Sequence, residues 1–250
     1  CGQVNRPSYV LRTAALGFAQ PHTSGTEDAC DLTPDGTPRP EMRGIEDLAM
    51  TAIAANTATP TIKNATLSEQ AAVTSVVVMA FSTDPMARWS WPTSHEYLVN
   101  FPRLVKVFGE KAFTQDSAYY VEGYAGAALW LPPGIGPDEA ALTALTRESI
   151  ATSLQSDILA VFAQMERYHP AEPHWFLPLL AVDPTHQGKG LGSALLRPVL
   201  ERCDREKKLA YLESSNPRNI PLYERHGFEV LGRIQSGSSP TVVPMLRKPK

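Results

Sequence analysis

Residues 182–193 read Val-Asp-Pro-Thr-His-Gln-Gly-Lys-Gly-Leu-Gly-Ser, with glycine at positions 188, 190 and 192. An apolar run, residues 174–182, precedes this turn and predicts a strand. Apolar residues after the turn recur at helical spacing, at Leu191, Leu195, Val199 and Cys203. Glycines let a backbone approach a ligand closely, and the N-terminus of a helix attracts anions. The turn therefore predicts a site for a phosphate or diphosphate, to which Lys189 can add a positive charge.

Three interpretations of this turn compete. It can be a glycine-rich surface loop without a ligand. It can belong to a dinucleotide fold, because Glu213 ends the next predicted strand, but five residues (183–187) separate strand from glycines and the last glycine spacing is one residue instead of two. A Walker phosphate loop is excluded, because no Gly-Lys-Ser/Thr follows four spacer residues. The third interpretation is a coenzyme A turn, Gln/Arg-x-x-Gly-x-Gly/Ala, which Gln187, Gly190 and Gly192 complete.

Outward from the turn, strands and helices alternate. We expect strands at 61–65, 118–121, 125–131, 174–182, 210–213, 228–233 and 242–247. We expect helices at 66–81, where Thr66 and Glu69 suggest a capping box, and at 95–108, 138–168 in two pieces, 190–207 and 220–226. Residues 86–92 are predicted to form an aromatic loop, because Asp84-Pro85 reads as a helix stop. This order indicates an α/β or α+β chain around a mixed sheet.

Residues 1–60 lack a sustained periodicity and carry clustered turn formers, as in 34–38, so we expect an irregular or disordered extension. The chain does not begin with methionine, and we hypothesise that Met50 is the natural start. The folded domain is predicted to cover residues 61–250.

Composition narrows the classes of function. A hydrophobic fraction of 43% and a charged fraction of 20% are ordinary for a globular protein. The net charge of −3 argues against nucleic acid as a partner, and no apolar run is long enough to predict a membrane span. The three cysteines have no metal-ligand spacing and suit a reducing compartment. With no signal-peptide pattern at the printed start, we expect a cytoplasmic protein that binds no metal.

The turn at 186–193 and two further segments, 173–177 and 212–228, carry a family resemblance. They resemble the Gcn5-related N-acetyltransferase (GNAT) family, most closely its puromycin N-acetyltransferase branch. The resemblance implies an α/β (α+β) fold whose mixed, mostly antiparallel six- to seven-stranded sheet is flanked by helices and splays after the fourth strand. Pro178 agrees with such a gap, because proline in a central strand removes a ladder hydrogen bond. The implied co-substrate is acetyl-CoA, with no metal.

The resemblance also assigns residues. Asn219 would contact pantetheine, and the Tyr223 hydroxyl would meet the departing thiol as a proton donor. Asn219 and Tyr223 are four residues apart and so share one side of a short helix. On its own, Tyr223 could equally be a core aromatic beside Phe228. The full set expected to bind the coenzyme is Leu180, Ala181, Val182, Gln187, Gly188, Lys189, Gly190, Leu191, Gly192, Ser193, Asn219 and Tyr223.

A base must remove a proton from the acceptor amine, because an ammonium group is not nucleophilic. Glu213 is the first candidate, directly or through water; an ordinary ion pair for Glu213 and deprotonation by solvent are the alternatives. Trp89, Trp130 and Tyr124 are the candidates for lining an acceptor pocket, against the alternative that they are core residues.

The expected function is transfer of acetyl to a primary amine, by direct attack in a ternary complex. The acceptor is expected to be a small molecule, either puromycin-like or another antibiotic or aromatic amine. Two alternatives stay open: a protein N-terminus or lysine as acceptor, and a non-catalytic acyl-CoA sensor. We expect no nucleic-acid or membrane partner, and a monomer or homodimer.

Overall fold

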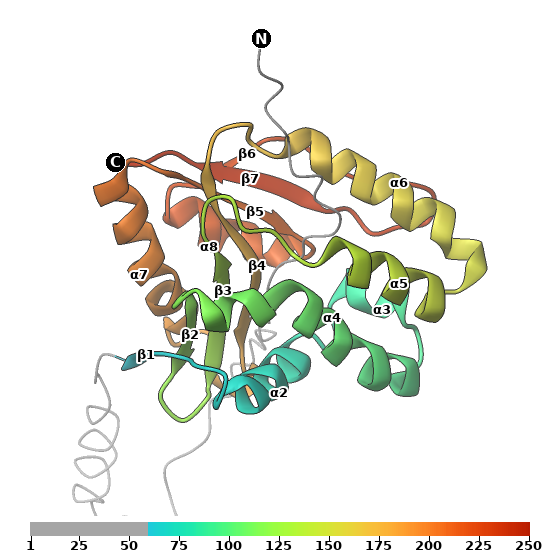
Figure 1. Cartoon of the computed structure of the whole chain (residues 1–250), viewed down its shortest axis with the longest axis horizontal. Helices are drawn as coiled ribbons and strands as arrows, with labels where there is room; N and C mark the ends of the chain where they lie inside the picture. The colour runs from blue at the N-terminus through green and yellow to red at the C-terminus, as the bar shows by residue number, and fades with distance from the viewer. Residues whose placement is uncertain (1–59) are drawn as a thin grey trace, which may run out of the picture. The chain divides into compact units, whose positions relative to one another are not determined.

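A seven-stranded sheet forms the centre of the computed structural model, which describes residues 60–250 (Figure 1). Its strand order is β1-β2-β3-β4-β5-β7-β6, and β4 and β5 form the parallel pair in an otherwise antiparallel sheet. The strands are β1 (Ile62–Asn64), β2 (Ala118–Val121), β3 (Gly126–Leu131), β4 (His174–Val182), β5 (Leu209–Ser214), β6 (Glu229–Val230) and β7 (Val243–Arg247). The predicted mixed, mostly antiparallel sheet is confirmed. The predictions for residues 1–59, including Met50, fall outside the described range.

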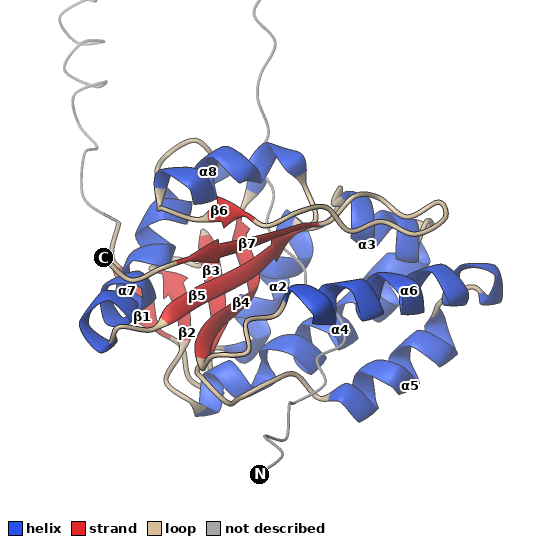
Figure 2. Cartoon of the chain, turned by 90° about the horizontal axis from the view of Figure 1, so that it is seen from above, coloured by secondary structure: helices blue, strands red, loops and turns tan. Residues whose placement is uncertain are grey.

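Helices cover both faces of the sheet (Figure 2). One face packs on α7 (Leu191–Glu206) and α8 (Ile220–Arg225). Because α7 begins at the turn predicted to bind a coenzyme, we call this the coenzyme face. The other face carries Glu213, the predicted base, and we therefore call it the acceptor face. It packs on five helices: α2 (Gln70–Ala80), α3 (Pro85–Ser90), α4 (Ser94–Thr114), α5 (Glu139–Ser149) and α6 (Thr152–Tyr168). Side chains of β3 alternate between these two cores, as a pleated strand requires: Leu129 faces the acceptor side and Trp130 the coenzyme side.

One predicted loop is wrong. Residues 86–92 were expected to be irregular, but α3 begins at Pro85. The Asp84 carboxylate caps this helix by accepting from the Ala87 N–H, and proline at the first helical position loses no hydrogen bond. The Asp-Pro pair therefore starts a helix here. The predicted capping box at Thr66 forms only in half: the Glu69 carboxylate accepts from the Thr66 N–H, while the Thr66 hydroxyl donates to Glu69.

The predicted splay lies beside Pro178. β4 pairs with β5 from His174 to Leu177, the last pair being Leu177 and Leu212. Beyond Pro178, β4 continues to pair with β3 alone, while Glu213 and Ser214 pair with β7. The register between β3 and β4 shifts by one residue here, which is a β-bulge: Leu177 and then Leu180 face the same core. Proline explains both effects, because it has no N–H to donate.

Gly126 lets β3 and β4 approach closely beside this splay. A Cβ built there would lie 2.8 Å from the Ala181 carbonyl oxygen and 3.1 Å from Leu195 Cδ1. Gly126→Ala should therefore lower the free energy of unfolding by about 1 to 3 kcal/mol, since a backbone atom must move. Urea denaturation measures this, and an unchanged midpoint would show that the strands separate there without cost.

Candidate active site

The glycine turn is built as a cradle of backbone N–H groups. Gly188 and Gly190 have φ of 75° and 78°, the left-handed region that glycine reaches without strain. Gly190 is the N-cap of α7, and the first hydrogen bond of that helix joins the Ala194 N–H to the Gly190 carbonyl at 3.1 Å. The N–H groups of Leu191, Gly192 and Ser193 therefore precede the helical ladder at the positive end of the dipole. This geometry suits a diphosphate.

Polar side chains hold the loop before the cradle in shape. Asp183 accepts from the Thr185 N–H at 2.7 Å, and its own N–H donates to the Ala125 carbonyl at 3.0 Å. The bonds from Thr185 lower the pKa of Asp183. The Gln187 amide donates to the Val182 carbonyl at 3.1 Å, and Lys189 Nζ donates to the Thr185 carbonyl at 3.1 Å. The side chains of Gln187 and Lys189 thus hold the loop in shape. That these two residues bind the coenzyme stays a prediction.

An open strand edge leads from the cradle into the sheet. Leu180, Ala181 and Val182 pair with β3 on one side, and their other side faces the splay. Leu180 and Val182 point into the coenzyme-face core, whereas Ala181 points into the acceptor-face core. An extended chain can hydrogen-bond along such an edge as an added strand does.

The start of α7 and the whole of α8 lie side by side. Ser193 Oγ and His226 Nε2 are 2.9 Å apart, and a Cβ on Gly192 would lie 3.2 Å from Leu222 Cδ2. Burial lowers the pKa of His226, helped by nearby cationic side chains. The Ser193 hydroxyl thus joins the start of α7 to the end of α8, while the prediction that Ser193 binds the coenzyme stays a prediction. This contact brings the helix that carries Tyr223 to the cradle.

Tyr223 and Glu213 lie on opposite faces of the sheet. Tyr223 is fully buried in the coenzyme-face core, where its ring meets Phe228 edge-on at 5.9 Å. Glu213 is fully buried on the acceptor face, where Oε1 accepts from the Tyr211 hydroxyl at 2.8 Å. Asn219, also buried, lies in the short turn that connects β5 to α8. The sheet therefore separates the Tyr223 phenol on one face from the Glu213 carboxylate on the other.

The three aromatic residues predicted to line one acceptor pocket do not converge. Trp89 packs against the acceptor-face core, and its Nε1 donates to Ser238 Oγ at 3.1 Å. Trp130 is fully buried in the core of the opposite face. Tyr124 stands at the tip of the β2–β3 hairpin, stacked on Tyr120 at 4.8 Å. Strand alternation turns Trp130 toward α7, so its side chain packs in that core, away from Trp89.

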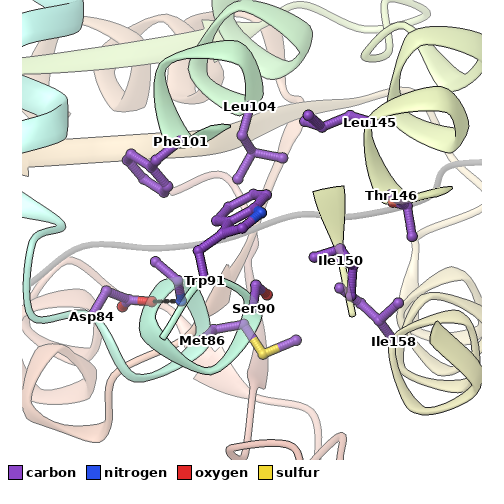
Figure 3. Close-up of a pocket in the computed structure, with 11 residues that line it drawn as sticks. Asp84, Met86, Ser90, Trp91, Phe101, Leu104, Leu145, Thr146, Ile150 and Ile158 are labelled. Carbon is purple, nitrogen blue, oxygen red and sulfur yellow. Dashed lines mark hydrogen bonds between the residues drawn. The ribbon is translucent and has the colours of Figure 1, made fainter. Parts of the chain in front are cut away.

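Sequence reasoning missed Asp84 and Ser215. Ser215 follows β5 directly, and its Oγ donates to Asp84 Oδ2 at 2.5 Å. Both residues are fully buried. Asp84 borders a pocket. The other residues that line this pocket are apolar, apart from Ser90 and Thr146 (Figure 3). Burial in these surroundings raises the pKa of Asp84 to about 6. The sequence signal was Asp84-Pro85, which had been interpreted only as a helix stop.

Cys203 is the one cysteine within residues 60–250, and it is fully buried inside α7. Burial raises the pKa of its thiol to about 12. A thiol with this pKa is almost entirely protonated at neutral pH and is a poor nucleophile. Cys203 is therefore unsuited to carry an acyl group.

The model of the acetyltransferase (GNAT) family matches residues 146–228. An uncharacterized N-acetyltransferase of Schizosaccharomyces pombe is 37% identical over 79 residues, which are 30% of this chain and 32% of that protein. A mycothiol acetyltransferase of Brachybacterium faecium is 32% identical over 91 residues, 34% of this chain and 28% of that protein. The chain thus spans about a third of the length of these curated relatives.

Solved structures match a larger share of the chain. One is described as histone acetyltransferase HPA2 and related acetyltransferase from Corynebacterium glutamicum; it is 27% identical with a TM-score of 0.56, covering 77% of this chain and 98% of its own. The polyamine N-acetyltransferase of Drosophila melanogaster has the same fold at 14% identity, with a TM-score of 0.51 and coverage of 76% and 100%. None of the helices in residues 60–250 combines the length and apolarity that a membrane crossing requires.

Proposed function

We propose, on the premise that this chain carries a GNAT-family acetyltransferase domain, that it transfers acetyl from acetyl-CoA to a primary amine. The single observation that carries the proposal is the N–H cradle of Gly188–Ser193 at the mouth of the β4–β5 splay. Diphosphate would lie on the cradle, and the pantetheine arm would run along the open edge of β4 at Leu180, Ala181 and Val182. Asn219 would hold the far end of that arm.

The two faces of the sheet would each supply one proton-transfer group. The amine nitrogen attacks the thioester carbonyl, a C–N bond forms and the C–S bond breaks. Glu213, on the acceptor face, takes a proton from the amine, and Tyr223, on the coenzyme face, gives one to the departing thiolate. The transfer is direct, and the buried Cys203 with its raised pKa supports this.

For the acceptor we propose a small-molecule amine, puromycin-like or aromatic, modified in the cytoplasm. Acetylation would remove the positive charge of the amine. The 27% identity with a structure described as a histone acetyltransferase and related acetyltransferase makes a protein amine the second candidate. An acyl-CoA sensor is the candidate from another class.

A thiol-release assay with acetyl-CoA and a panel of puromycin, polyamines and short peptides tests the proposal. We expect amine-dependent release, fastest with one small amine. Fastest release with peptides would favour the protein acceptor. A tight acetyl-CoA complex that releases thiol with none of the amines would contradict the enzyme and favour the sensor.

Glu213→Gln should lower kcat/KM by about 10²-fold at neutral pH, because the amide cannot accept the proton but keeps an oxygen for the Tyr211 hydroxyl. The same assay measures this. Glu122→Gln, at an exposed turn, is the control and should leave the rate unchanged. Equal rates for Glu213→Gln and the parent would assign Glu213 to packing alone.

A further inference from the structure

Asp84 and Ser215 join two distant segments at the end of β5. Ser215 lies two residues beyond Glu213, and its Oγ meets Asp84 Oδ2 at 2.5 Å on the acceptor face. The second oxygen, Oδ1, accepts from the Ala87 N–H at 2.9 Å. This hydroxyl–carboxylate pair therefore lies where β5 turns away from the splay toward Asn219.

The surroundings of Asp84 set its protonation. Apolar side chains of α3, α4, α5 and α6 line the pocket that it borders (Figure 3). The Tyr97 phenol on α4 interacts electrostatically with Asp84 and with Arg88 on α3, whose guanidinium lies 5.3 Å from the Tyr97 ring centre. Burial outweighs the hydrogen bonds from Ser215 and Ala87, so the pKa of Asp84 is raised to about 6 and the carboxylate is mostly ionised above neutral pH.

Proton balance leaves a role for a second acceptor. An amine that arrives as ammonium loses two protons on its way to an amide, one before the attack and one after it. One of these protons replaces the proton that Tyr223 gives to the thiolate, and the other leaves the protein. Glu213 accounts for one loss in the function proposed above, and a single carboxylate that is already protonated cannot take the second.

We propose that the Asp84–Ser215 pair takes one of these two protons, an inference that rests on the proposed acetyl transfer. The amine nitrogen passes a proton to Ser215 Oγ while the Ser215 hydroxyl passes its own proton to Asp84. The nitrogen loses one proton, Asp84 becomes a carboxylic acid and Ser215 is unchanged. Asp84 is thus a proton-accepting residue that acts through Ser215.

Helix capping alone does not explain this carboxylate. Asparagine or serine at position 84 would cap α3 as well, without a buried charge that burial disfavours. Asp138, the N-cap of α5, has the same capping bond, 3.0 Å to the Ala141 N–H, at an exposed position. The two caps therefore form a matched pair that differs in burial and in the contact with Ser215.

The test is the pH profile of thiol release between pH 5 and 9, with the fastest acceptor of the amine panel. The parent should show a rise in kcat/KM centred near pH 6, because Asp84 accepts a proton only when ionised. Asp84→Asn should lose this rise and be slower by about 10²-fold at pH 8, whereas Asp138→Asn should match the parent. Ser215→Ala should be slow in the same way, and Ser215→Thr, which keeps a hydroxyl, should recover most of the rate.

The outcomes separate the two proposals. If the parent releases no thiol with any amine, the acetyl transfer itself is wrong. If the parent is active and Asp84→Asn keeps its rate and its pH profile, the relay alone is wrong. Should Asp84→Asn fail to fold, the Ser215 variants decide: equal rates for Ser215→Ala and the parent overturn the relay.

Discussion

Tyr223→Phe should lower kcat for thiol release on the order of 10³-fold and leave the Kd for acetyl-CoA within about threefold. The variant loses the one group on the coenzyme face proposed to protonate the departing thiolate. It keeps the ring that meets Phe228 at 5.9 Å, so the core should remain packed. Steady-state kinetics measure the first quantity and calorimetric titration the second.

Tyr119→Phe is the control for this substitution. Tyr119 lies on β2 and also packs against the coenzyme-face core, but its hydroxyl contacts the Asp116 carbonyl at 3.5 Å. Its removal should leave kcat unchanged. A Tyr223→Phe variant with the turnover of the parent would remove Tyr223 from the chemistry and leave it as a core aromatic.

Gly190→Asp should raise the Kd for acetyl-CoA by about 10²-fold or more. Aspartate tolerates the left-handed conformation better than most residues and is a good N-cap, so α7 should still form. Its carboxylate, however, would take the N–H groups of the cradle and repel the diphosphate. Calorimetric titration with acetyl-CoA measures the loss.

Gly134→Asp is the control that distinguishes repulsion of the diphosphate from backbone strain. Gly134 has a φ of 82° and an open surrounding, as Gly190 does, but lies in the loop between β3 and α5. It should bind acetyl-CoA as the parent does. If Gly190→Asp also bound normally, the diphosphate would not lie at the start of α7.

Local signals allowed much of the coenzyme side to be predicted from the sequence. β4 has the predicted bounds, His174–Val182. They could be predicted because the apolar run and the Asp-Pro pair that ends it are both visible in the local sequence. The family resemblance implied the gap and Pro178 agreed with it, since a residue without an N–H interrupts a ladder wherever the strand lies. Gly188 and Gly190 of the turn are left-handed, as glycine readily allows, whereas Gly192 lies inside α7.

The acceptor side depends on contacts between distant segments. Asp84 and Ser215 are 131 residues apart, and no periodicity relates them. The pair Asp84-Pro85 can end one helix or begin the next, and in the structure it begins α3, with Asp84 as the cap and proline at the first helical position. The sequence also did not determine which side of the sheet Trp130 faces. Strand alternation assigns neighbouring residues to opposite faces but does not say which helices cover each face.

Binding of acetyl-CoA to the unmodified protein tests the central claim most directly. Calorimetric titration should show one acetyl-CoA per chain, competition by CoA, and no heat with a nicotinamide dinucleotide at the same concentration. Absence of acetyl-CoA binding, or binding of the dinucleotide in its place, would contradict the assignment of the glycine turn and with it the acetyl transfer.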